Sequence, residues 1–190
     1  MSKRSLLSGL LVIVVAMGSE FARAQKSSLA TSEQKTLVIN TSDLTKPVLK
    51  EIQDIEGRMV AIAGDFPDDL YNTYRPKGDP DVRTAAQILL HIAEQNYSAA
   101  SLIRTKQQQE ALIAAGKVPH ANDVLTFVSK QDTVEKVKGS FAAVRNAIEE
   151  NADPKKAEWW VYVIAHSNGH FGNLVAYYRV NGLVPPTSRQ

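Results

Sequence analysis

The chain has 190 residues, no cysteine, and a formal net charge of +2 from 22 basic and 20 acidic residues. The lack of cysteine excludes disulfides and the lipidated cysteine of a bacterial lipoprotein. The near-neutral charge offers no basic surface, so we expect no nucleic-acid partner. One domain of this size can bury an adequate core without disulfides.

The first 24 residues have the three-part pattern of a secretory signal peptide. Lys3 and Arg4 are basic, residues 6–17 are apolar, and Ala22-Arg23-Ala24 is a cleavage site. The apolar run is shorter than the about 20 residues of a membrane span, although an uncleaved anchor is the alternative. We predict an exported protein, periplasmic or secreted, with no stable membrane anchor after cleavage and a mature charge of 0.

Residues 25–42 are polar, and we expect a flexible leader there. The first helix is predicted over residues 45–63, where apolar side chains recur at three- and four-residue steps. The second helix is predicted to begin with Asp79 as N-cap and Pro80 at its first position. It runs to about residue 105, and a continuation towards residue 115 stays open.

The third helix is predicted from Asp132 to Glu150, on a narrow apolar stripe. The fourth begins near Asp153-Pro154 and ends at Gly182, a left-handed cap. No strand pattern is evident. Four such helices with short to moderate connectors predict an all-α fold, a four-helix bundle over residues 43–190.

His166 and His170 lie four residues apart in the fourth helix, about 40° apart on one face. Imidazoles at this spacing can bind one transition metal ion. Ser167 occupies the position where a zinc protease carries glutamate, which excludes that class. The alternative is a pair of partly buried histidines whose hydrogen bonds are made by neighbouring groups.

A catalytic metal site usually has a third protein ligand and an open position. His91, on the polar side of the second helix, is either a surface histidine or part of a polar groove between helices. We expect His120 to be a solvated loop residue. Glu94 is a candidate general base if it turns into the groove, and Asn173 and Tyr177 are candidates for orienting an imidazole.

The back of the fourth helix is also apolar, so either other parts of the chain or a second subunit must cover it. We predict a homodimer. The residues concerned are Trp160, Ile164, Phe171, Val175 and Tyr178.

The run "HSNGHFGNLVAYYRVNGLVPP", residues 166–186, resembles the signature of the DinB/YfiT-like superfamily. The last helix of that family reads His-x-x-x-His-aromatic-Gly, then Tyr-x-Arg-x-x-Gly, then Pro-Pro. The stretch "RPKGDPDVRTAAQILLHIAEQNY", residues 75–97, is similar to the family's second helix, which carries one histidine. The resemblance covers about residues 45–186.

The resemblance implies a bundle in up-down-down-up order with a long crossover. It also implies a divalent metal, often zinc or nickel, held by three histidines, here His91, His166 and His170. Relatives include thiol-dependent S-transferases and hydrolase- or isomerase-like enzymes, in which the metal lowers the pKa of a bound thiol or water. We therefore predict a metal-dependent transferase or hydrolase of a small molecule. The alternative is a non-catalytic protein in which the ion ties the second helix to the fourth.

Overall fold

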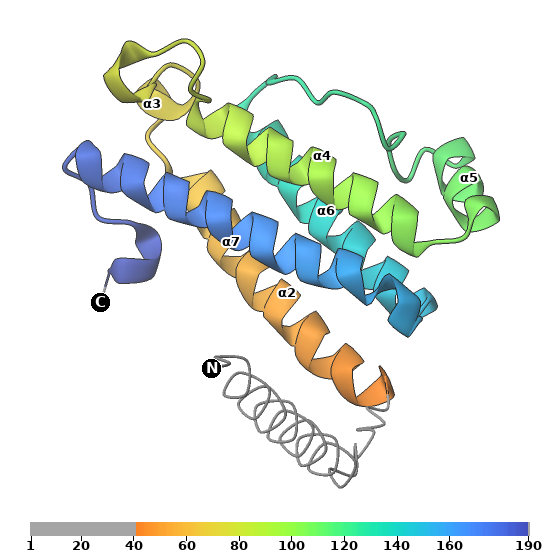
Figure 1. Cartoon of the computed structure of the whole chain (residues 1–190). Coiled ribbons are helices and arrows are strands. Elements are labelled where there is room, and N and C mark those ends of the chain that lie inside the picture. Colours follow the sequence, from red (N-terminus) through yellow and green to blue (C-terminus); the bar gives the residue numbers. More distant parts are fainter. Residues whose placement is uncertain (1–40, 190) are drawn as a thin grey trace, which may run out of the picture. The chain divides into compact units, whose positions relative to one another are not determined.

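The structure, a computed structural model, describes residues 41–189, and every regular element in that range is helical. The all-α prediction is therefore confirmed. The long helices are α2 (Thr41–Asp65), α4 (Ala85–Ile103), α6 (Lys130–Glu150) and α7 (Ala157–Val180), shown in Figure 1. The connectors contain α3 (Asp68–Tyr71), α5 (Lys106–Ala114) and the 3₁₀ turns η1 (Pro76–Gly78) and η2 (Pro154–Lys156), and a further 3₁₀ turn, η3 (Pro186–Ser188), follows α7.

The predicted signal peptide and most of the predicted leader lie outside the described residues. The leader was expected to extend to residue 42, which is wrong, because residues 41 and 42 already belong to α2. No helix of residues 41–189 is long and apolar enough to cross a membrane.

The long helices pack in a fixed pattern of directions. Helix α4 contacts α6 and α7, and α2 contacts the same two helices. Side-chain contacts between the helices show that α4 runs antiparallel to α7 and parallel to α6, and that α2 runs parallel to α7. The contacts that fix these directions are Tyr162–Gln95, Tyr177–Arg83, Asn96–Ser140, Arg104–Ala143, Arg58–Phe171 and Asp65–Tyr178.

One apolar core fills the space between these helices. The apolar face predicted for the first helix is confirmed, because its central residues Ile52, Ile55, Met59 and Ile62 are at most 1% exposed. Burying a side chain of this size contributes about 1.5–3 kcal/mol. Larger members come from the other elements and the connectors: Phe66, Tyr71, Phe141, Trp160 and Tyr178.

Helix α4 begins later than predicted. Thr84, not Asp79, is its N-cap, and Thr84 and Gln87 form a capping box in which each side chain accepts from the other residue's backbone N–H. Asp79 instead accepts a hydrogen bond from the backbone N–H of Asp81 in the preceding turn. A glutamine three residues after the cap satisfies two backbone donors at once, and Asp79 has no such partner.

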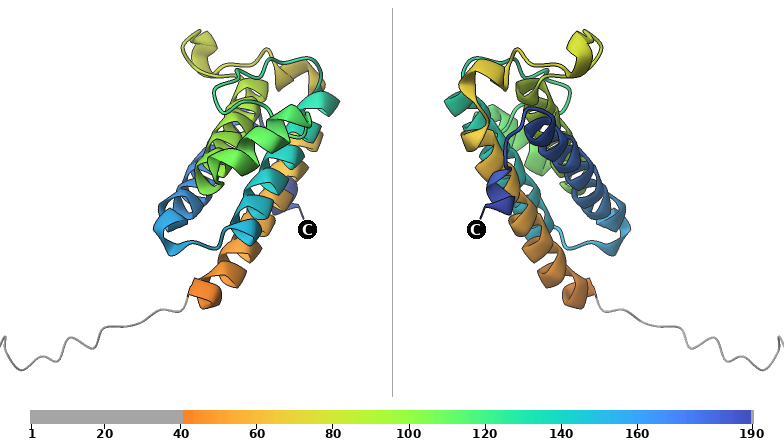
Figure 2. Two further views of the ribbon diagram at one scale, coloured as in Figure 1. Left: turned by 90° about the vertical axis from the view of Figure 1, so that its right-hand side faces the viewer. Right: turned by 90° about the vertical axis from the view of Figure 1, so that its left-hand side faces the viewer.

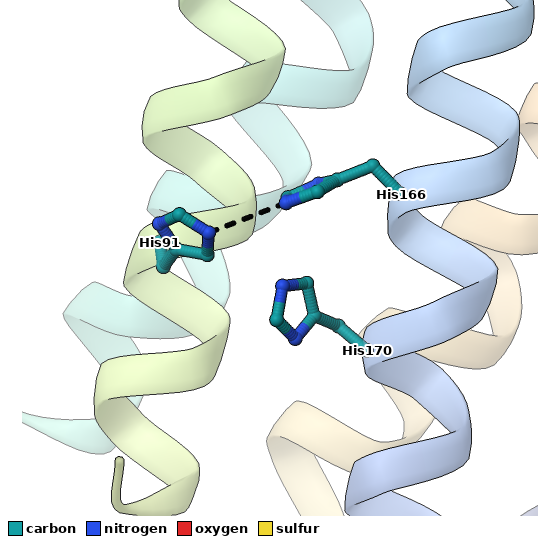
Figure 3. Close-up of side chains that lie close together, drawn as sticks. All are labelled: His91, His166 and His170. Carbon is teal, nitrogen blue, oxygen red and sulfur yellow. Dashed lines mark hydrogen bonds between the residues drawn. The ribbon is translucent and has the colours of Figure 1, made fainter. Parts of the chain in front are cut away.

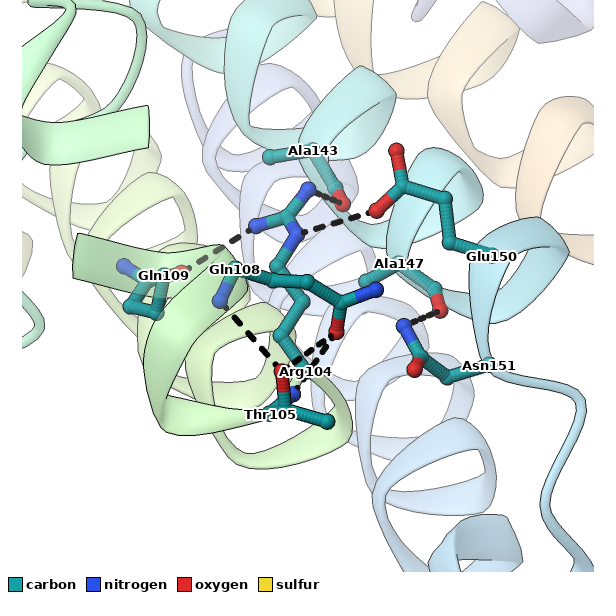
Figure 4. Close-up of polar contacts among 8 residues, drawn as sticks. All are labelled: Arg104, Thr105, Gln108, Gln109, Ala143, Ala147, Glu150 and Asn151. Carbon is teal, nitrogen blue, oxygen red and sulfur yellow. Dashed lines mark hydrogen bonds and ion pairs between the residues drawn. The ribbon is translucent and has the colours of Figure 1, made fainter. Parts of the chain in front are cut away.

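Helix α4 also ends at Ile103, so a continuous helix to residue 115 is wrong. Thr105 and Gln108 form a second capping box, which starts α5. Arg104 between the two helices is buried and donates to the Ala143 carbonyl at 2.8 Å, while its Nε lies 3.7 Å from Glu150 (Figure 4). This anchor holds the chain where it changes direction.

The third and fourth predicted helices need smaller corrections. Helix α6 begins at Lys130, with Ser129 as N-cap, because the Ser129 side chain accepts from the backbone N–H of Asp132. Helix α7 begins at Ala157 after the turn η2, and Gly182 has a φ of 73°, as a left-handed cap requires.

The connector before α4 meets the end of the crossover, residues 115–129, at one end of the long helices (Figures 1 and 2). Tyr71 and Phe127 pack there with their ring centroids 5.9 Å apart. This end of the molecule carries a pocket beside α4.

Candidate metal centre

Three histidines converge between α4 and α7. His91 comes from α4, and His166 and His170 come from successive turns of α7 (Figure 3). The ring centroid of His91 lies 5.1 Å from the centroid of His166 and 5.1 Å from that of His170, and the last two centroids are 4.6 Å apart. One ring nitrogen from each residue lies within 4.8 Å of the others, so the group could hold a metal ion.

Hydrogen bonds on both sides of the histidines fix the register of the two helices. Tyr162 donates to the Gln95 side chain at 2.8 Å, and Tyr177 donates to the Arg83 carbonyl at 2.7 Å. The helices are antiparallel, and His91 lies between Arg83 and Gln95 along the chain. The four-residue step then brings both α7 imidazoles opposite His91.

The spacing of the nitrogens suits a transition metal. Two imidazole nitrogens bound at about 2.1 Å to a tetrahedral ion lie about 3.4 Å apart. The Nε2 atoms of His91 and His166 are 3.2 Å apart. The donor set consists of imidazole nitrogens alone, which zinc, nickel and neighbouring ions accept.

The imidazoles are held in the neutral form that metal binding requires. Burial lowers the pKa of His166 to about 4, with further lowering by His170 and His91. Burial also lowers the pKa values of His91 and His170. At pH 7 the ring nitrogens therefore keep a free lone pair for an ion.

One nitrogen of the histidine group has no hydrogen-bond partner within the described residues. His166 Nδ1 is buried without a partner, and the Tyr162 ring stacks on the imidazole at 5.2 Å. The Nε2 atom of His166 faces another imidazole rather than a distinct donor or acceptor. The alternative of two histidines satisfied by neighbouring groups is therefore not met at His166, since a buried polar atom normally has a partner.

Two polar side chains lie near the outer nitrogens. The Asn173 amide nitrogen is 3.4 Å from His170 Nδ1, in the position that an orienting residue would take. A Glu94 carboxylate oxygen is 3.9 Å from His91 Nδ1. The role predicted for Tyr177 is wrong, because its hydroxyl reaches the Arg83 carbonyl and not an imidazole.

His120 is exposed in the crossover and does not belong to the histidine group. Its backbone N–H donates to the Asp123 carboxylate, which holds a local turn. The expectation of a solvated loop residue is confirmed.

A pocket of about 490 Å³ lies beside His91. Connector, α4 and crossover all contribute to its walls, and Glu94 turns into it. Glu94 also accepts a hydrogen bond from the Leu125 backbone N–H at 2.7 Å, which fastens the crossover to α4. His91 is thus part of a groove and not a plain surface histidine.

Sequence reasoning missed Arg83 and the bond between Glu94 and Leu125. Arg83 lines the pocket, and its positive charge contributes to the lowered pKa of all three histidines. The position of Arg83 directly before the Thr84 cap could have indicated its place in the pocket, because the start of α4 faces the same groove as His91. The Leu125 bond had no signal, since 31 residues separate its partners.

Comparison with known proteins gave no match: no family model, no curated protein and no solved structure matches the chain.

Proposed function

We propose that the chain is a DinB/YfiT-like metal-binding protein whose ion, zinc or nickel, is held by His91, His166 and His170. We propose further that this centre serves a transferase or hydrolase reaction on a small molecule. The single observation that carries the proposal is the convergence of three neutral imidazoles from two helices beside a pocket. Three protein ligands next to an accessible space is the usual arrangement of a catalytic metal site.

The helix directions support the family assignment. Helix α7 runs parallel to α2 and antiparallel to α4, and α6 runs parallel to α4. This corresponds to up-down-down-up order, with residues 104–129 as the crossover between α4 and α6. The order is independent of the histidine motif, so it adds to the resemblance rather than repeating it.

The chemistry divides between the ion and the chain. A bound divalent ion supplies Lewis acidity, which lowers the pKa of water or a thiol. The chain's residues hold and orient: the three imidazoles supply lone pairs, and Asn173 and Glu94 lie where they can fix ring orientation. Glu94 is also a candidate for accepting a proton, since its carboxylate faces the pocket.

Elemental analysis of the purified protein tests the metal site. We expect about one zinc or nickel per chain, and none in the His166→Ala, His170→Ala double variant. His120→Ala is the matched control, because this exposed histidine lies outside the group and its loss should leave the metal content unchanged. A protein that stays metal-free after incubation with several divalent ions would overturn the proposal.

A non-catalytic role has support of its own, because an ion bound here would tie α4 to α7. An open coordination position separates the two functions. In cobalt-substituted protein, added azide should change the visible spectrum if a position is open. An unchanged spectrum would favour the structural role.

We also propose export, with Gln25 as the mature N-terminus, which N-terminal sequencing of secreted protein tests.

The proposed homodimer uses the back of α7, where Ile164, Phe171 and Val175 remain partly exposed while Trp160 and Tyr178 are covered within the chain. Phe171→Glu should shift the protein to a monomer on a sizing column. An unchanged elution volume would count against the dimer.

A further inference from the structure

The pocket beside His91 has a charged side and an apolar side. The connector before α4 supplies Arg75 and Arg83 to its wall, and α4 supplies His91 and Glu94. The apolar side consists of Leu90 and three residues of the crossover, Val124, Leu125 and Phe127. A few polar groups against an apolar wall, in a space of about 490 Å³, is typical of a site for a small organic molecule.

The two arginines of the pocket differ in what they already bind. The Arg75 guanidinium donates to the Val82 carbonyl, so it holds the connector in place. Arg83 is exposed, and among residues 41–189 its side chain has no ion-pair or hydrogen-bond partner. The Arg83 backbone is fixed, because its carbonyl accepts from Tyr177 of α7. Arg83 therefore presents an uncompensated positive charge from a held position.

Arg83 lies close to the candidate metal centre, because Arg83 and His91 line the same pocket. An anion bound to Arg83 would thus lie in the space that His91 borders. Guanidinium groups pair with carboxylates through two parallel hydrogen bonds, which also fixes the orientation of the bound molecule.

Two acidic residues limit which anion fits. Glu94 uses one oxygen to accept from the Leu125 backbone, and Asp81 also lines the pocket. A doubly charged phosphate would be repelled by both carboxylates. A singly charged carboxylate on an apolar body meets one free guanidinium and a wall of Leu90 and Phe127.

We propose that this pocket binds a small organic carboxylate, with Arg83 pairing the carboxylate and the apolar wall covering the rest of the molecule. The inference rests on the proposed metal function, because it names the class of substrate that the centre would act on. It makes Arg83 a specificity-determining residue rather than a metal ligand.

Calorimetric titration of the zinc-loaded protein tests this, with benzoate and hexanoate as probes and benzyl alcohol as the neutral counterpart of benzoate. We expect the wild-type protein to bind a carboxylate. The Arg83→Gln variant should bind it with about tenfold lower affinity, as for a lost hydrogen bond to a charged group. Arg83→Lys should keep part of the affinity, and benzyl alcohol should bind equally weakly to both proteins.

Asp81→Asn is the matched control, because it changes a charge of opposite sign in the same pocket. It should leave benzoate affinity unchanged or raise it, whereas an equal loss in both variants would mean that the pocket was merely disturbed and would overturn the inference. Absence of binding by either carboxylate, or equal binding by wild type and Arg83→Gln, would also overturn it.

Metal analysis of the same samples separates the two proposals. Arg83→Gln should retain its zinc. Binding of benzoate through Arg83 in a protein that holds no metal would support the pocket and refute the metal function.

Discussion

Helix α4 has two faces with opposite properties. Towards α6 and the core, Leu89, Ala93 and Ala100 are fully buried, and Asn96 donates to Ser140, which donates to the Val137 carbonyl. Towards α7 and the pocket, His91 is only partly buried and faces other imidazoles. The first face packs into the core of the bundle, whereas the second faces a cluster of three imidazoles in which His166 Nδ1 is buried without a partner. The difference separates a packing surface from a candidate binding surface on one helix.

The largest expected effect is on the packing face. Leu89→Ala removes a fully buried side chain and should lower the free energy of unfolding by about 2–5 kcal/mol. Urea unfolding of metal-free protein measures this. Metal content of the folded variant should match wild type, because Leu89 points away from the groove. Loss of the metal together with stability would mean that the two faces are not independent.

The second prediction concerns a variant that should lose metal binding but keep the stability of the metal-free protein. Saturating zinc at about 100 times its dissociation constant should stabilise the wild type by about 2.7 kcal/mol. His91→Ala should lose this stabilisation but unfold like wild type when both are metal-free, because His91 is partly exposed and contributes little to packing. Thermal unfolding with and without zinc provides the measurement. A large loss of stability in metal-free His91→Ala would place this histidine in the core.

The contrast between the faces also explains what the sequence could predict. The packing face has a period: Ile52, Ile55, Met59 and Ile62 recur at helical spacing, and all are buried. The α7 pair is likewise local, since residues four apart must share a face. Both could be recognised without knowing how the helices pack.

What could not be predicted depends on contacts between distant segments. His91 stayed ambiguous because only its pairing with α7 decides between a surface and a groove. The predicted start of α4 was wrong because both Asp79-Pro80 and the Thr84–Gln87 pair are plausible N-terminal caps. The Thr84–Gln87 pair forms two reciprocal hydrogen bonds with the backbone, so the helix begins there. The position of Glu94 depends on a crossover that returns 31 residues later.

The third prediction concerns pH in metal-free protein. The pKa of His166 is about 4 in the folded state and about 6.5 when unfolded. Between these values the unfolded chain binds a proton that the folded chain does not, so stability is complete above about pH 6.5 and is lost as the pH falls towards 4. From pH 7 to pH 5 we expect a loss of about 1–2 kcal/mol, allowing for partial exposure. Urea unfolding at each pH should show a shallower dependence in His166→Gln, and parallel curves would contradict the assignment.

The smallest expected effect tests how the two elements beside His91 are joined. Glu94→Gln keeps an oxygen that can accept from the Leu125 backbone N–H but removes the negative charge near His91 Nδ1. Loss of such a partner weakens metal binding about tenfold, or about 1.4 kcal/mol. Competition with a chelator measures the zinc affinity.

Glu94→Ala is the companion variant, because it removes both the charge and the bond to the crossover. If Glu94 acts on the metal only through His91, both variants should weaken zinc binding equally, and only the alanine variant should expose the crossover to faster hydrogen exchange at Leu125. If instead the alanine variant binds zinc much more weakly, the crossover itself holds the metal-binding face together. The pocket wall and the histidine group would then form one cooperative unit, with Glu94 as the residue that joins them.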